Sequence, residues 1–437
     1  MCGREGVVYV TNAEVLTFLP EKTPATPNTQ SDTAEMKILL VHNSYQQPGG
    51  EDVVFNQERQ LLERAGHQVP TYCRSNCEIA GYSASKRLVL AGRMVWARDS
   101  RREIATLIRR EKPDLVHVHN TFLMVSPSIY SACKEAHVPV MQTLHNYRLL
   151  CPAAIFFRRG RVCEECLEHG LWRGVVHGCY RNSRAETSAV ALMLAVHRWL
   201  GTWSEMVDCF IALSEFSHRK FIEGGIPTEK VAVKPNFVFR DPGCRAQSGE
   251  YALFIGRLSP KKRVVTLLAA WQQLQVRIPL RIAGSGPERA SLEAQAKQIG
   301  LSDIRFLGQL PRDQVIAALK RGRFLVFTSE WYENFPMTIV EAFACGVPVI
   351  CSRLGAMGEI VADGRTGLHF TAGDAEDLAQ KVEWAWAHPE EMAAMGRAAR
   401  AEYEAKYTAE RNYEMLMKIY QGVMHVCNAR DMVRGSP

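Results

Sequence analysis

Two glutamates, Glu333 and Glu341, stand eight residues apart in the most informative stretch of the sequence, residues 329–348. Pro336 lies between them and favours a helix start, where its missing N–H costs little. Glu333 would then lie on the preceding loop and Glu341 more than one turn inside the helix. Carboxylates placed in this way can hold two hydroxyl-bearing parts of one extended ligand, while the exposed N–H groups of the helix start can bind a phosphate between them.

Four cations lie close together after an apolar run at 252–255; they are Arg257, Lys261, Lys262 and Arg263. An arginine can bind phosphate oxygens bidentately and a lysine adds a point charge, so this turn is suited to a diphosphate. A solvated basic turn is the alternative interpretation.

Glycine-rich turns follow two other apolar runs, as Gly49-Gly50 and as Gly284-Ser285-Gly286. Glycine allows a ligand to approach the backbone closely, and free N–H groups at a helix start suit an anion. Gly49-Gly50 can equally be a simple turn. The second turn departs from the G-x-G-x-x-G pattern and therefore does not indicate a dinucleotide site.

Four of the thirteen cysteines lie in one loop-like segment, as Cys151, Cys163, Cys166 and Cys179. The central C-x-x-C can supply two thiolates from one tight turn, and the two flanking cysteines would complete a tetrahedral zinc site. Packed reduced thiols and a redox pair are the alternatives. A disulfide framework is not expected, because the sequence shows no secretory signal.

Short β-branched runs alternate with amphipathic helical stretches, which favours βαβ units and parallel sheets. Ligands of such sheets bind outside the carboxyl ends of the strands, where the residues above are found. His117 and His119 alternate along one run, and we expect them to pack rather than to bind metal. The predicted strands are 38–41, 115–118, 138–143, 209–213, 252–255, 280–283, 304–307, 324–327 and 347–351.

The length of 437 residues exceeds what one compact core normally holds and predicts two domains. The apolar pattern stops near 239–250, where Asp, Pro, Gly and Ser take over, so the boundary is placed there. We expect Met36 to be the natural start. The predicted parts are a disordered extension 1–35, a first domain 36–240 with a Cys-rich insert 151–179, a second domain 241–407, a helix 408–425 packing back on the first domain, and a tail 426–437.

These segments resemble the retaining, nucleotide-sugar-dependent glycosyltransferases of family 4, over nearly everything from Met36 to about Val423. The resemblance implies the α/β GT-B architecture, in which two Rossmann-like doubly wound domains face each other across a cleft. Its most specific part is the Glu-x7-Glu segment with Gly346-Val-Pro348. Support comes from Thr143-Leu-His145-Asn146 and from Lys234-Pro-Asn236.

The resemblance implies an acceptor-side first domain, a nucleotide-sugar-binding second domain and two groups of site residues. Arg257 and Lys262 would neutralise the diphosphate leaving group, the electrostatic contribution expected to dominate. Glu333 would bind donor-sugar hydroxyls and Glu341 the ribose. The catalytic residues would be His145, Glu333, Arg257 and Lys262, and the donor-binding residues Gly49, Gly50, Asn236, Gly256, Gly284, Gly286, Asn334, Phe335, Pro336, Met337, Thr338 and Glu341.

Four positions depart from the family pattern. Asn334 stands where glycine is frequent, Asn146 where aspartate is frequent, Lys261 where glutamate is common, and Arg263 where glycine is common. The added cations bear on which nucleotide or sugar is preferred. Because no Asp-x-Asp element lies at a strand end, we expect no catalytic metal and no cofactor for catalysis beyond the UDP- or GDP-sugar donor.

The segment 86–112 carries nine Lys or Arg against three acidic residues, a net charge of nine minus three, +6, with apolar residues interleaved. Such a segment can lie on an anionic membrane surface; a solvated helix face is the alternative. The whole chain carries only +7, so nucleic acid is not an expected partner. No run approaches a membrane span. We therefore expect a cytoplasmic protein, peripheral at the inner face of the membrane.

The predicted activity is transfer of a sugar, with retained configuration, to a lipid-linked or polysaccharide precursor. A nucleotide-sugar epimerase of the same fold and a non-catalytic sugar-nucleotide-binding subunit are the alternatives. A phosphorylase would need a pyridoxal lysine, for which the sequence has no motif.

Overall fold

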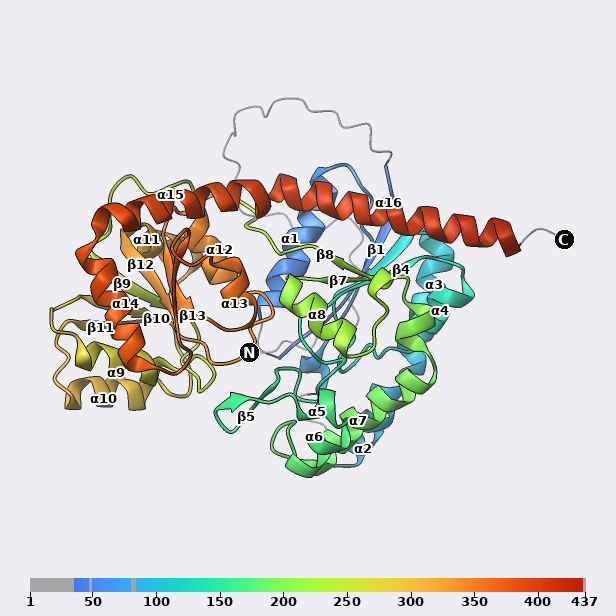
Figure 1. Ribbon diagram of the computed structural model, residues 1–437. Helices are drawn as coiled ribbons and strands as arrows, with labels where there is room; N and C mark the ends of the chain where they lie inside the picture. Colours follow the sequence, from blue (N-terminus) through green and yellow to red (C-terminus); the bar gives the residue numbers. More distant parts are fainter. Residues whose placement is uncertain (1–34, 47–48, 80–83, 435–437) are drawn as a thin grey trace. The chain divides into compact units, whose positions relative to one another are not determined.

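The computed structural model describes residues 35–46, 49–79 and 84–434 (Figure 1). The predicted extension 1–35 lies, except for its last residue, outside the described residues. Among the residues that are described, no helix is both long enough and apolar enough to cross a membrane.

The first six-stranded sheet has the order β2-β1-β3-β4-β7-β8. Its pairings of β1 with β2, β1 with β3 and β3 with β4 are all parallel. Residues Ile38 to Val41 are completely buried, as is typical of a parallel sheet covered on both faces. The strands are β1 Ile38–Ser44, β2 Thr71–Ser75, β3 Leu115–Val118, β4 Val140–Thr143, β7 Cys209–Ala212 and β8 Val231–Val233.

The second six-stranded sheet has the order β11-β10-β9-β12-β13-β14, and all of its strand pairs are parallel (Figure 1). Its two faces are covered by separate clusters of buried apolar side chains. The strands are β9 Tyr251–Ile255, β10 Leu280–Ala283, β11 Ile304–Gly308, β12 Gly322–Phe327, β13 Val349–Ser352 and β14 Gly367–Phe370.

Most helices lie between these strands in the sequence, and α14 to α16 follow the last strand. A small hairpin, β5 Phe157–Arg158 with β6 Arg161–Val162, interrupts the first half. The helices of the first half are α1 Gly50–Arg64, α2 Ala84–Val95, α3 Arg98–Glu111, α4 Ile129–Glu135, α5 Glu165–Glu168, α6 Trp172–His177, α7 Arg184–Trp199 and α8 Glu215–Glu223. Those of the second half are α9 Val264–Gln273, α10 Arg289–Gln298, α11 Arg312–Arg321, α12 Met337–Ala344, α13 Gly355–Ile360, α14 Ala375–Ala387, α15 Pro389–Lys406 and α16 Ala409–Arg434.

All nine predicted strands are confirmed, and five strands were not predicted: β2, β8 and β14 of the two large sheets and β5 and β6 of the hairpin. These strands are short, and β2 contains the charged residue Arg74. The predicted tail 426–437 is wrong in its first part, because α16 continues to Arg434. Helical phasing carries on through His425–Arg434 without a glycine or proline to end it.

Contacts divide the chain into two units, which we describe separately. Among the described residues, one unit consists of those up to Thr143, of Leu192–Phe210 and of those from Lys418 onward, and the other consists of Leu144–Ala191 and Ile211–Met417. This division differs from the predicted boundary at 240–241, because much of the chain between Leu144 and that boundary groups with the second sheet.

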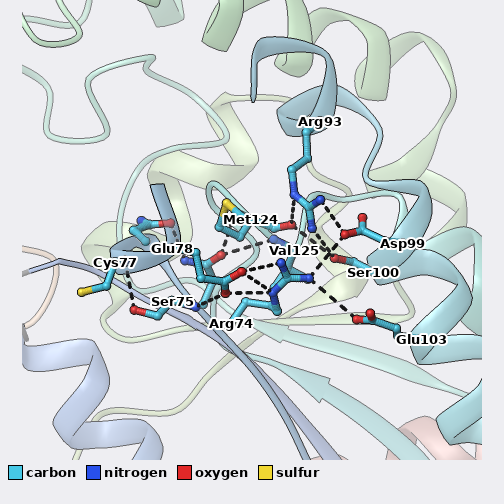
Figure 2. A network of polar contacts seen from close by, with 12 residues as sticks. Arg74, Ser75, Cys77, Glu78, Arg93, Asp99, Ser100, Glu103, Met124 and Val125 are labelled. Atoms are coloured by element: carbon cyan, nitrogen blue, oxygen red, sulfur yellow. Dashed lines mark hydrogen bonds and ion pairs between the residues drawn. The ribbon is translucent and has the colours of Figure 1, made fainter. Parts of the chain in front are cut away.

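A buried arginine explains why β2 is interrupted by charge. Arg74 is 8% exposed, and its guanidinium binds Glu78 at 2.5 Å and lies 3.5 Å from Asp99 and 3.7 Å from Glu103 (Figure 2). Arg93 of α2 joins this network through Asp99 at 2.5 Å. At least one cation of the basic segment 86–112 therefore faces the interior.

Candidate functional site

Glu333 accepts hydrogen bonds from three side chains on the loop that follows β12 and on the turn that follows β9. Lys262 Nζ lies 2.6 Å from its Oε1, and Ser329 Oγ and Trp331 Nε1 each lie 2.7 Å from the same oxygen. Glu333 as a whole is 7% exposed. Two of the predicted catalytic residues are thus in direct contact, and their charges compensate each other where solvation is poor.

The two lysines of this turn also lie against aromatic faces. Lys262 Nζ is 4.4 Å from the ring centroid of Phe327, and Lys261 Nζ is 4.5 Å from that of Trp331. Burial lowers the pKa of Lys261, and the cations Lys262 and Arg257 act in the same direction while Glu333 opposes them. Lys261, Lys262 and Arg257 thus form one group of cations beside Glu333.

Arg263 occupies a backbone conformation that favours glycine, with φ at 48°. Its guanidinium forms an ion pair with Glu330 at 2.9 Å, and Thr266 Oγ1 donates to the same carboxylate at 3.0 Å. This ion pair fixes the turn, and the left-handed φ accounts for the frequent glycine of the family at this position.

The glycines of the two turns allow two backbones to cross at close range. A Cβ on Gly284 would lie 1.9 Å from the carbonyl oxygen of Gly256, and one on Gly286 would lie 2.2 Å from that of Leu258. Gly256 N donates to Ala283 O at 3.0 Å. Backbone packing therefore requires glycine at positions 284 and 286 independently of the predicted contact with a donor.

The predicted helix start after Pro336 is confirmed, since α12 begins at Met337. Met337, Thr338 and Glu341 are half-buried, whereas Ile339 and its neighbours pack into the core. Arg312 Nη1 lies 3.3 Å from Glu341 Oε1. Burial raises the pKa of Glu341, an effect that Arg312 partly opposes.

His145 is half-buried just after β4. The Asn334 side chain donates to the carbonyl oxygen of its neighbour Leu144 at 2.6 Å, and the Asn334 amide oxygen is buried without a hydrogen-bond partner among the described residues. The residue that replaces the family's glycine thus brings the loop of Glu333 against the segment that carries His145. Phe335 is half-buried on the same loop.

Asn236 lies in a segment held by α16. Asn412 Nδ2 donates to Pro235 O at 2.7 Å, and the fully buried Lys234 Nζ lies 3.2 Å from Asn412 Oδ1. Asn236 is 4% exposed, and its Oδ1 is buried with no hydrogen-bond partner among the described residues. A buried acceptor of this kind marks a position suited to a ligand's donor group.

Gly49 and Gly50 belong to the other unit, at the start of α1. Gly49 N donates to Asp52 Oδ2 at 2.7 Å, and no atom of the described residues lies within 4 Å of a Cβ built on Gly50. Asp52 Oδ1 in turn lies 2.9 Å from His42 Nε2. The structure therefore places these glycines at a helix start.

His117 and His119 are buried and face Glu58 of α1, at 3.2 Å and 3.3 Å. His117 also hydrogen bonds Tyr420 of α16 and Thr143, each at 2.8 Å. Burial lowers the pKa of His119 to about 4. This geometry agrees with the predicted packing role, because both nitrogens of His117 already have protein partners.

Sequence reasoning missed Ser329, Trp331, Glu330 and Arg312 as site residues. The first three directly follow β12, so their position at a strand end was available as a signal. Arg312 starts α11, far from Glu341 in sequence, and no local pattern connects the two.

Two family models match this chain. The model described as "Glycosyltransferase Family 4" matches residues 48–241, and "Glycosyl transferases group 1" matches residues 240–402. The chain belongs to the family 4 glycosyltransferases. Its two parallel six-stranded sheets with their helices confirm the predicted GT-B architecture of that family.

Among curated relatives of this family 4 chain, D-rhamnosyltransferase WbpZ of Pseudomonas aeruginosa is 34% identical over 36% of this chain and 42% of its own. Glycogen synthase of Mycobacterium tuberculosis is 29% identical over 67% of this chain and 64% of its own. The chain thus spans less than two thirds of the length of these relatives.

Two solved structures share the fold over almost all of this family 4 chain. An Anabaena protein, HepE, in complex with UDP matches with a TM-score of 0.63 at 19% identity, over 89% of this chain and 100% of that chain. Sucrose-phosphate synthase from Thermosynechococcus elongatus matches with a TM-score of 0.66 at 17% identity, over 90% and 100%.

Proposed function

We propose that the protein is a retaining glycosyltransferase that moves a sugar from a UDP- or GDP-sugar to an acceptor. The observation that carries this proposal is the 2.6 Å pair of Lys262 and Glu333 at the carboxyl ends of β9 and β12. This pair places a cation suited to the diphosphate in direct contact with a carboxylate suited to the sugar hydroxyls. Retention of configuration follows the family 4 resemblance of the segment from Glu333 to Glu341.

The pair suggests how the donor is received. All three donors to Glu333 reach Oε1, which leaves Oε2 to accept hydroxyls of the transferred sugar. The diphosphate competes for Lys262, while Ser329 and Trp331 keep the carboxylate in place. As the bond between the sugar and the diphosphate breaks, Lys262 and Arg257 stabilise the charge that develops on the leaving group.

Glu341 is proposed to hold the ribose, and its burial gives this role a measurable consequence. A carboxyl group whose pKa is higher in the folded than in the unfolded protein stabilises the fold at pH values below its unfolded pKa. This stabilisation is lost as the pH rises through the pKa of the folded protein. At neutral pH the ionised group is therefore unfavourable for folding. A charged acceptor nevertheless binds hydroxyls more strongly than an amide does.

Glu341→Gln is expected to raise the melting temperature at neutral pH and to weaken donor affinity about tenfold, the loss of roughly one charge-assisted hydrogen bond. Thermal unfolding and calorimetric titration with UDP- and GDP-sugars measure the two effects. Glu293→Gln, which removes an exposed partner of Arg289 on α10, is the control and should change neither. A less stable Glu341→Gln variant with unchanged donor affinity would contradict the assignment.

An acceptor carried on a lipid would bring the protein to an anionic membrane surface, and the first unit offers an apolar patch for it. Trp199 and Leu192 of α7 are 84% and 57% exposed, and Val89 and Trp96, on and just after α2, are 72% and 36% exposed. His197 Nε2 hydrogen bonds Val95 O at 2.8 Å, so α2 and α7 lie side by side (Figure 1). We define these four residues as the α2–α7 patch.

The patch suits a membrane interface because exposed tryptophans partition there and cations nearby add attraction to anionic lipid. Trp199→Ser combined with Leu192→Ser is expected to reduce co-sedimentation with phosphatidylglycerol vesicles at low salt several-fold. Trp172→Ser, at a tryptophan that is 56% exposed on α6, is the matched control and should sediment as the parent does. Equal sedimentation of both variants and the parent would eliminate the membrane proposal.

Product analysis with a panel of UDP-, GDP- and ADP-sugars tests the proposed activity. A transferase gives a glycosylated acceptor and free nucleoside diphosphate, an epimerase gives an isomerised donor, and a binding subunit gives no product. Donor isomerisation or mere binding by the purified protein, with polyprenyl-phosphate-linked sugars supplied as acceptors, would refute the proposal.

A further inference from the structure

The insert 151–179 is poor in features that normally hold a chain segment in place. Its regular structure consists of two strands of two residues and helices of four and six residues. Few of its residues are buried, and two of these, Cys151 and Cys166, are cysteines. Small irregular modules of this kind usually depend on disulfides or a structural metal.

One carboxylate organises the surroundings of the central C-x-x-C. Glu165, which lies between Cys163 and Cys166, accepts from Arg173 at 2.8 Å and from His177 at 2.9 Å, and it also pairs with Arg158. These three partners come from α6 and from the β5–β6 hairpin. Every element of the insert is therefore drawn toward the turn that carries the two cysteines.

Gly174 is the point at which the flanking cysteines approach this turn. A Cβ on Gly174 would lie 3.2 Å from Cys166 Sγ and 3.1 Å from Pro152, the neighbour of Cys151. The backbone N–H of Cys179 donates to the carbonyl oxygen of Gly174 at 3.1 Å. The absence of a side chain at this glycine thus lets parts of the chain from both ends of the insert close around Cys166.

The loop after Cys151 adopts strained backbone conformations around its sulfur. Ala154 and Phe156 have φ at 65° and 45°, although neither is glycine. Such conformations persist only where the surrounding structure holds them in place.

We propose that Cys151, Cys163, Cys166 and Cys179 bind one structural Zn²⁺ ion. Four thiolates fill a tetrahedral zinc site completely and leave no position for a substrate, so the ion serves the fold rather than the chemistry. Among the described residues, Glu58, His117 and His119 form a group of potential metal ligands whose ligand atoms all lie within 4.8 Å of one another, and the four cysteines do not form such a group. The four sulfurs are therefore spaced more widely than that and close around the ion as it binds.

The zinc site would stabilise a surface that reaches the loop of Glu333. Phe156 packs against Tyr147 at 5.1 Å and against Tyr332 at 6.3 Å, between ring centroids, and Tyr332 precedes Glu333 in the chain. Glu164 binds Lys220 of α8 at 2.9 Å. Loss of the ion is therefore expected to disturb the loop of Glu333 through Tyr332. Zinc content can be measured whether or not the protein has the proposed activity, so the two proposals are tested separately.

Metal analysis of the full-length protein, purified without affinity to immobilised metal, tests the proposal. One zinc per chain is expected, and Cys163→Ser with Cys166→Ser should reduce it to background. Cys244→Ser, at an exposed free thiol outside the insert, is the control and should retain the ion. If the double variant does not fold, the parent protein is used for the test. Chelation should then lower its melting temperature and added zinc should restore it. Replacement of the zinc by Co²⁺ should give the thiolate-to-cobalt absorption bands.

Two results would overturn the zinc proposal. One is a parent protein that is free of zinc even when it is expressed with added zinc and kept reduced. The other is a double variant that keeps its zinc. A Cys151–Cys166 disulfide in the untreated protein, found by mass spectrometry, would assign these cysteines to redox chemistry instead.

Discussion

Lys262→Ala is expected to lower turnover by about 10²–10³-fold, the loss that follows removal of one group that stabilises developing charge. Its Nζ lies 2.6 Å from Glu333 Oε1, so the change removes a leaving-group cation and also leaves a largely buried carboxylate without its counter-charge. The first effect reduces kcat, and the second destabilises the loop that follows β12.

Product formation at saturating donor and thermal unfolding of the same preparations separate these two effects. Lys297→Ala removes an exposed lysine from α10 in the same unit and should retain parental turnover and stability. Glu333→Gln serves as the complementary variant, because it removes the negative charge, keeps the shape of the side chain and leaves Lys262 in place. A folded Lys262→Ala protein with parental turnover would refute the assignment of the diphosphate cation.

The double variant Lys262→Ala with Glu333→Gln tests whether the two residues act as a unit. If they do, the double variant should be little slower than the worse single variant, because residues of one catalytic group are strongly non-additive. Multiplicative losses would instead indicate that each residue binds its own part of the donor and that their contact matters only in the free enzyme.

The sequence was sufficient for the parallel sheets and for most of the loop positions of the site. Apolar runs fix the strands of a doubly wound sheet, and ligand residues must follow strand ends, so Glu333 and Lys262 could be assigned without coordinates. The strand β2 was missed because it contains the charged residue Arg74, whose partners Asp99 and Glu103 lie far away in the sequence. The strand β8 was missed because a strand of three residues shows no recognisable period.

The contacts within the site could not be read from the sequence. The direct pairing of Lys262 with Glu333, the pairing of Arg312 with Glu341 and the bond from Asn334 to Leu144 join residues far apart in the chain or depend on side-chain reach. The helical and strand periodicities of the sequence carry no information on such long-range side-chain pairs. The glycines of the turns were located correctly, but the backbone crossing that requires them appears only in three dimensions.

Gly284→Ala is expected to destabilise the protein by on the order of 3 kcal/mol, and this change decides between packing and ligand binding as the reason for the glycine. Its φ of 138° is a region that L side chains rarely adopt, and the new Cβ would lie 1.9 Å from Gly256 O. The three nearest atoms all belong to the backbone of Gly256, so no side chain can rotate away to relieve the clash. Displacing the Gly256 turn would also move Arg257 and Lys262.

Two other glycines separate the contributions to this effect in thermal unfolding experiments. Gly300 has φ at 75° with no atom within 4 Å of a built Cβ, so Gly300→Ala measures strain alone and should cost about 1 kcal/mol. Gly422 on α16 also has open space and no positive φ, so Gly422→Ala should stabilise by up to about 1 kcal/mol. Gly284→Ala should be much worse than either. A Gly284→Ala protein as stable as the parent that no longer binds UDP would show instead that ligand approach, not backbone crossing, requires glycine at this turn.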